Sequence, residues 1–182
     1  MHNHNGNVRS GSSARNLGRV LLIALVALAG LGSALAQDNT GLLRFKGAIG
    51  VIPVTGVAAN GTVNLNVVRG VSPGNPWKIT ALDAVVTPSG EIKLVGRGLL
   101  LAAGNGIGTN AGQSVHATLF CGPAATATSH NSTLAGVALR ANGDFAIDDV
   151  LSPLPPAVCE TPVLLIRNVG GVWFAAAIRK VD

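Results

Sequence analysis

The chain has 182 residues, with 13 Lys or Arg against 8 Asp or Glu, so its formal net charge is +5. Aromatic residues make up only 3% of it, and the basic residues that follow position 36 are scattered along the chain. Proteins that bind nucleic acid concentrate basic side chains on one face and interleave them with stacking aromatics. The composition therefore argues against a nucleic-acid partner.

Residues 1–36 have the pattern of a cleavable secretory signal peptide. A basic segment without acids precedes an apolar run over 20–29, and its arginines are Arg9, Arg15 and Arg19. Small residues, Ala34 and Ala36, stand just before Gln37, as cleavage sites require. The apolar run is shorter than the roughly 20 residues that a membrane-spanning helix needs. We therefore expect cleavage between Ala36 and Gln37, a secreted or periplasmic product, and no membrane span after cleavage.

Residues 37–182 have the length of one ordinary domain, and we expect a single secreted β domain there. Alternation of apolar and polar residues recurs along it, whereas a sustained helical period does not. The first predicted strand covers 42–52 and bends where Gly47 and Gly50 fall. A second covers 63–68. The third and fourth, 77–87 and 91–101, are joined by Pro88-Ser89-Gly90, a turn sequence that predicts a hairpin.

Beyond a glycine-rich loop over 103–113, the alternation predicts a strand over 115–121. Segments 134–140 and 144–148 flank Asn142-Gly143, a dipeptide that strongly favours hairpins. Segments 163–167 and 172–179 flank a second glycine-containing turn. About eight or nine short strands with frequent turns predict an all-β fold, an antiparallel β-sandwich. The alternative is a small closed β-barrel.

The mature chain has two cysteines, Cys121 and Cys159. In an oxidising compartment, with no third thiol to compete, they are expected to form a disulfide. The other interpretations are two free buried thiols or a metal pair. A zinc site usually needs four Cys or His ligands, and only His116 and His130 remain in the mature chain, so the metal interpretation is the weakest.

No catalytic motif is assembled in the mature sequence, and we expect no cofactor and no metal. The run Gly104-Asn105-Gly106-Ile107-Gly108 leads into a strand rather than a helix, so it lacks the helix N-terminus that phosphate-binding loops use. His116 and His130 are expected to face solvent or to form local hydrogen bonds. If the chain binds a ligand near this loop, the candidate side chains are Arg97, Asn105, Asn110 and His116.

The segment Gly74-Asn75-Pro76-Trp77 is followed by Gly96-Arg97-Gly98-Leu99, by Gly108-Thr109-Asn110 and by Cys121. This order resembles a group of uncharacterised secreted bacterial all-β proteins with a G-x-P-W segment and a later cysteine pair. A fainter similarity is to CHRD-type β-domains, in the region that leads to His116 and Cys121. The shared motifs imply a common fold and no particular activity.

Together these features predict an exported, non-enzymatic binding or structural module. Its partner would be an unidentified extracellular or periplasmic ligand or protein. The alternative is a small secreted hydrolase or ligand carrier that uses the 104–112 loop. A pocket that gathers His116, Arg97 and an acid would favour the alternative, whereas a filled core with bare loops would favour the first function.

Overall fold

The computed structural model describes residues 42–181, and the signal-peptide segment with its cleavage site lies outside them. Every regular element in this range is a β-strand, which confirms the predicted all-β class. The strands are β1 (Leu43–Gly50), β2 (Val54–Val57), β3 (Val63–Leu65), β4 (Trp77–Lys78), β5 (Ala81–Val86), β6 (Glu91–Arg97), β7 (Leu100–Leu101), β8 (Ser114–Cys121), β9 (Thr128–Asn131), β10 (Val137–Ala138), β11 (Phe145–Val150), β12 (Val163–Asn168) and β13 (Trp173–Lys180).

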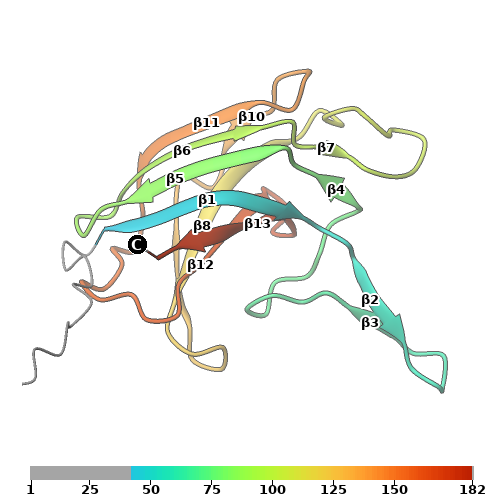
Figure 1. Cartoon of the computed structure of the whole chain (residues 1–182), viewed down its shortest axis with the longest axis horizontal. Helices are drawn as coiled ribbons and strands as arrows, with labels where there is room; N and C mark the ends of the chain where they lie inside the picture. The colour runs from blue at the N-terminus through green and yellow to red at the C-terminus, as the bar shows by residue number, and fades with distance from the viewer. Residues whose placement is uncertain (1–41, 182) are drawn as a thin grey trace, which may run out of the picture. The chain divides into compact units, whose positions relative to one another are not determined.

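One antiparallel sheet of nine strands forms the body of the fold. Its strand order is β10-β8-β12-β13-β1-β5-β6-β11, with β9 paired to β8 (Figure 1). The sheet curls until its two end strands, β10 and β11, contact each other without forming a ladder. The two facing layers thus belong to one continuous sheet, an arrangement close to the barrel that the sequence allowed as an alternative.

The concave face of the sheet carries the hydrophobic core. Alternation on β5 and β6 buries one side of each strand, with Leu82, Ile92 and Leu94 at most 2% exposed. The other side of β6 carries Lys93 and Arg97, and Lys93 Nζ lies 2.7 Å from Asp148 Oδ2 on β11. This division of charged and apolar side chains between the faces is the one that the sequence predicts for the hairpin.

Strand β8 is buried on both faces, and a connecting segment covers Trp173 on β13. The segment 66–74 bonds to Trp173 three times: the Trp173 indole Nε1 donates to Asn66 O (2.9 Å), the Trp173 amide donates to Ser72 O (3.1 Å), and the Gly74 amide donates to Trp173 O (2.9 Å). Trp173 and Phe174 are therefore both buried although they are adjacent in one strand.

The structure contains the turns that the sequence predicts, but one of the predicted strand pairings is absent. The β5–β6 and β12–β13 hairpins are confirmed, and β1 has an irregularity next to Gly47 (φ 80°). The turn at Asn142-Gly143 also forms, with Gly143 N donating to Arg140 O (2.8 Å). However, the strands on its two sides do not form the predicted hairpin: β10 pairs with β8, and β11 pairs with β6.

The short hairpin of β2 and β3 stands apart from the sheet (Figure 1). Val54 pairs with Leu65 and Val57 with Val63, so these four side chains share one face. All four are between 42% and 63% exposed. The hairpin thus adds nothing to the core, and β2, like β9, is a strand that the sequence did not indicate.

Candidate functional site

Residues from β4, β7 and the turn between β12 and β13 line a pocket. Its volume is about 410 Å³, within the range of roughly 300–1,000 Å³ that is usual for small-molecule sites. Other pockets in the described part of the chain have volumes of about 170, 240 and 270 Å³. The lining residues of this pocket, called the ligand pocket below, are Pro73, Gly74, Asn75, Trp77, Leu101, Ala111, Gln113, Asn168, Val172 and Phe174.

The G-x-P-W segment builds one wall of the ligand pocket. Trp77 stacks on Phe174 of β13, with ring centroids 4.2 Å apart and planes 19° from parallel. Gly74 packs against the same Phe174 ring, and a Cβ at this position would lie 2.8 Å from the ring atom Cε1. Position 74 therefore has to be glycine for the segment to approach the ring. The motif is explained by packing that shapes the pocket.

Three side-chain amides supply the polar part of the lining. The Asn168 amide Nδ2 donates to Gln113 Oε1 (3.1 Å), and Asn168 Oδ1 accepts from the Val172 backbone amide (3.2 Å). These bonds hold two amides in place. Asn75 is exposed, and its side chain makes no hydrogen bond within residues 42–181. Amide, aromatic and aliphatic groups, with no charged side chain among the lining residues, suit an uncharged ligand that forms hydrogen bonds.

The four side chains proposed for a ligand loop lie in different surroundings. Asn105 is exposed in the 102–113 loop. Asn110 is structural there, because its Nδ2 donates to Leu139 O (2.9 Å) and Arg140 O (3.1 Å). Arg97 lines a separate pocket with Arg140 and Asp144. His116 is buried on β8, so the structure does not gather Arg97, His116 and an acid into one pocket.

His116 is only 2% exposed, and neither ring nitrogen has a hydrogen-bond partner among the described residues. The expectation that it faces solvent or forms local hydrogen bonds is wrong, because both faces of β8 are covered. Its partner across the ladder is Arg167 of β12. Burial first, and the Arg167 charge second, lower the pKa of His116 to about 4. Burial also lowers the pKa of Arg167, whose Nη1 donates to Thr118 Oγ1 (3.3 Å).

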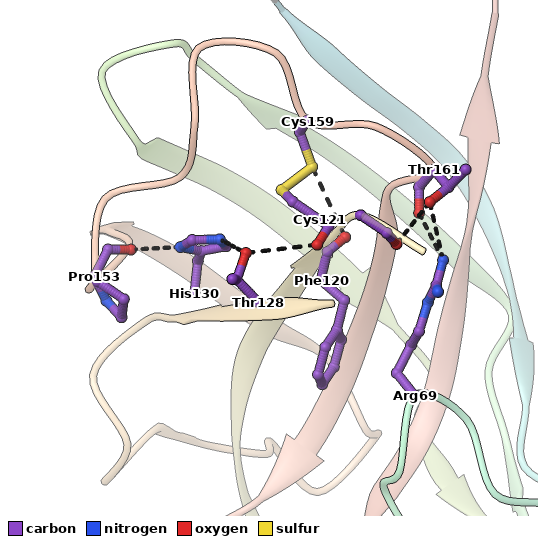
Figure 2. Close-up of a disulfide and its surroundings, with 9 residues drawn as sticks. Arg69, Phe120, Cys121, Thr128, His130, Pro153, Cys159 and Thr161 are labelled. Carbon is purple, nitrogen blue, oxygen red and sulfur yellow. Dashed lines mark hydrogen bonds between the residues drawn. A yellow bond between two sulfur atoms is a disulfide. The ribbon is translucent and has the colours of Figure 1, made fainter. Parts of the chain in front are cut away.

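His130 forms local hydrogen bonds, as the sequence analysis expected (Figure 2). Its Nδ1 lies 2.8 Å from the carbonyl oxygen of Pro153, which can only accept, so Nδ1 carries the proton and donates it. In the neutral ring, Nε2 then accepts from the Thr128 hydroxyl at 2.9 Å. His130 thus ties strand β9 to the loop that follows β11.

The predicted disulfide between Cys121 and Cys159 is present, with the two Cα atoms 4.8 Å apart (Figure 2). It joins the end of β8 to the proline-rich loop before β12. Thr161 strengthens the same junction, because its hydroxyl donates to Gly122 O (2.7 Å) and its carbonyl accepts from Arg69 Nη2 (2.9 Å). The bridge therefore anchors a loop that has few apolar contacts of its own.

Comparisons of the chain with models of protein families, with curated proteins and with solved structures found no match. Residues 42–181 contain no helix of the length and hydropathy needed to cross a bilayer. The same residues contain no group of three or more His, Cys, Asp or Glu placed to hold a metal ion. The pockets of the described residues are therefore the features that point to a function.

Proposed function

We propose that the chain is an exported binding module, and that its ligand is a small uncharged molecule held in the ligand pocket. The observation that carries the proposal is the pocket itself: about 410 Å³ in volume, walled by the Trp77–Phe174 pair and lined by the amides of Asn75, Gln113 and Asn168. Aromatic and aliphatic walls bury the apolar part of a ligand, and a few fixed amides orient its polar groups. Saccharides and uncharged peptides have this mixture of surfaces.

Binding is a better account of this pocket than hydrolysis. A hydrolase needs a nucleophile or an activated water, together with a general base within about 3 Å of it. The candidates that the sequence offered for such work, Arg97 and His116, lie outside the ligand pocket. Its amides donate and accept hydrogen bonds but do not ionise near neutral pH, so they cannot serve as a general acid or base. A ligand carrier is compatible with the same geometry.

Export is the second part of the proposal. It is supported by the signal-peptide pattern of residues 1–36 and by the disulfide, since disulfides persist mainly in oxidising compartments. The protein recovered from the periplasm or the medium is expected to begin at Gln37. Its intact mass should be two hydrogens below that of the reduced chain. Retention of Met1, or alkylation of both thiols without prior reduction, would contradict export or the bridge respectively.

The ligand assignment is tested by titrating the purified protein with uncharged mono- and disaccharides and with capped, uncharged dipeptides. For any compound that binds, Asn75→Ala is expected to weaken binding by about 3- to 10-fold, the effect of one neutral hydrogen bond. Asn105→Ala is the matched control, because Asn105 is also an exposed loop asparagine and lies outside the pocket. Equal losses in both variants, or no binding of any of these uncharged compounds, would refute the proposal.

A further inference from the structure

A second pocket lies where the end of β6 meets the start of β11, and it differs from the ligand pocket in being charged. Its volume is about 240 Å³, and its lining residues are Val95, Gly96, Arg97, Arg140, Asp144, Phe145 and Ala146. We propose that Arg97 and Arg140 form a binding site here for a single oxyanion, the carboxylate or sulfate group of a small ligand. The site shares no residue with the ligand pocket, so the inference does not depend on the proposed function.

The backbones of both arginines are fixed. The Arg97 carbonyl accepts from the Thr80 amide (3.0 Å) and from the Thr80 hydroxyl (2.9 Å). The Arg140 amide donates to Asp144 O (3.0 Å), and the Arg140 carbonyl accepts from Asn110 Nδ2 (3.1 Å) and from the Gly143 amide (2.8 Å). The side chains of both arginines are exposed, and each extends from a backbone position that these bonds hold in place.

The one acid of this pocket is already occupied. Asp144 Oδ1 accepts from the Gly98 amide (3.1 Å), and Oδ2 accepts from Asn142 Nδ2 (2.9 Å). No ion pair joins Asp144 to either arginine within residues 42–181. The carboxylate is thus used to shape the turn that carries Arg140. Two guanidinium groups against one carboxylate leave the pocket with a formal charge of +1, which one monoanion would neutralise.

The apolar lining and the size of the pocket limit what it can hold. Val95 of β6 and Ala146 of β11 pair across the two strands and are exposed, so they give the pocket an apolar wall beside the arginines. A volume of 240 Å³ corresponds to about eight liquid waters, at roughly 30 Å³ each, and is below the range of drug-sized sites. A carboxylate or sulfate with a short apolar or sugar portion fits this description. Guanidinium groups bind such planar or tetrahedral oxyanions through paired N–H donors.

The test is a titration of the purified protein with sodium sulfate, and separately with sodium acetate, at constant low ionic strength, followed by backbone amide NMR. Saturable shifts are expected for residues 95–97 and 140–146 with at least one of the two anions. Each arginine would form charge-assisted hydrogen bonds with the anion. We therefore expect Arg97→Gln and Arg140→Gln each to weaken binding by about 10- to 100-fold. Arg44→Gln is the matched control, since Arg44 is an exposed arginine on β1 outside the pocket.

The inference is overturned if neither anion shifts these amides in a saturable way. It is also overturned if Arg44→Gln lowers the affinity as much as Arg97→Gln does, because the attraction would then come from overall charge. The anion that binds more tightly distinguishes a sulfate site from a carboxylate site. The same spectra show whether each variant is folded, because a folded variant keeps the signal dispersion of the unmodified protein.

Discussion

Replacing Cys121 and Cys159 together by alanine is expected to lower the free energy of unfolding by about 4 kcal/mol. The two residues are 38 positions apart, and the bridge removes the entropy that this loop would gain in the unfolded chain. The loss is a large share of the 5–15 kcal/mol that holds a typical domain folded. Alanine is preferred to serine because Cys121 is only 3% exposed, and a serine hydroxyl there would need a new partner.

Urea unfolding of the double variant, and of the unmodified protein with and without a reductant, measures this loss. The reduced protein and the double variant should show similar decreases, since both lack the bridge. The bonds of His130 with Pro153 and of Thr161 with Gly122 hold the same loops, so the fold itself is expected to persist. Unchanged stability in both samples would contradict a native bridge.

Acidification from pH 7 to pH 4 is expected to lower the free energy of unfolding by about 3 kcal/mol through His116 alone. In the unfolded chain this imidazole has its ordinary pKa of 6.5, whereas in the folded protein its pKa is about 4. Between these values the unfolded state binds a proton that the folded state does not bind. The stability is therefore complete above pH 6.5, falls as the pH decreases, and levels off below about pH 4.

Chemical unfolding at several pH values between 7 and 4 measures this slope, and His116→Gln should remove most of it because glutamine does not titrate. His130→Gln is the matched control: it removes the other described histidine and should leave the contribution of His116 in place. Hydrogen bonds from Thr133 and Val150 lower the pKa of Asp149 from its ordinary 3.8. The stability that Asp149 contributes is therefore lost mainly below pH 3.8, outside most of the range from pH 7 to pH 4. A His116→Gln variant with the slope of the unmodified protein would contradict the account.

The turns and the strand faces could be predicted from the sequence, because they depend on residues that are close together in the chain. Pro88-Ser89-Gly90 specifies a turn by itself, and alternation over 91–97 places Lys93 and Ile92 on opposite faces. The turn at Asn142-Gly143 was predictable for the same reason. Its flanking strands pair elsewhere because the chain crosses there from one end strand of the curled sheet to the other, and no local pattern encodes that crossing.

The burial of His116 and the ligand pocket both depend on contacts between distant segments. Alternation marks the two faces of β8 but does not show that both of them are buried. The ligand pocket needs the 73–77 segment, the 111–113 end of a loop and the turn between β12 and β13. Gly74 and Trp77 were visible as a motif, yet the role of Asn168 follows only from its bond to Gln113, 55 residues earlier in the chain.

The chain has two tryptophans, and their indole N–H groups provide the most direct test of the ligand pocket. Trp77 borders the pocket, whereas the Trp173 indole donates to Asn66 O. In a ¹H–¹⁵N spectrum, with the two signals assigned by Trp173→Phe, an uncharged ligand that binds in the pocket is predicted to shift the Trp77 signal in a saturable way and to shift that of Trp173 less. A ligand that binds while the Trp77 signal stays in place would contradict the assignment of this pocket as the functional site.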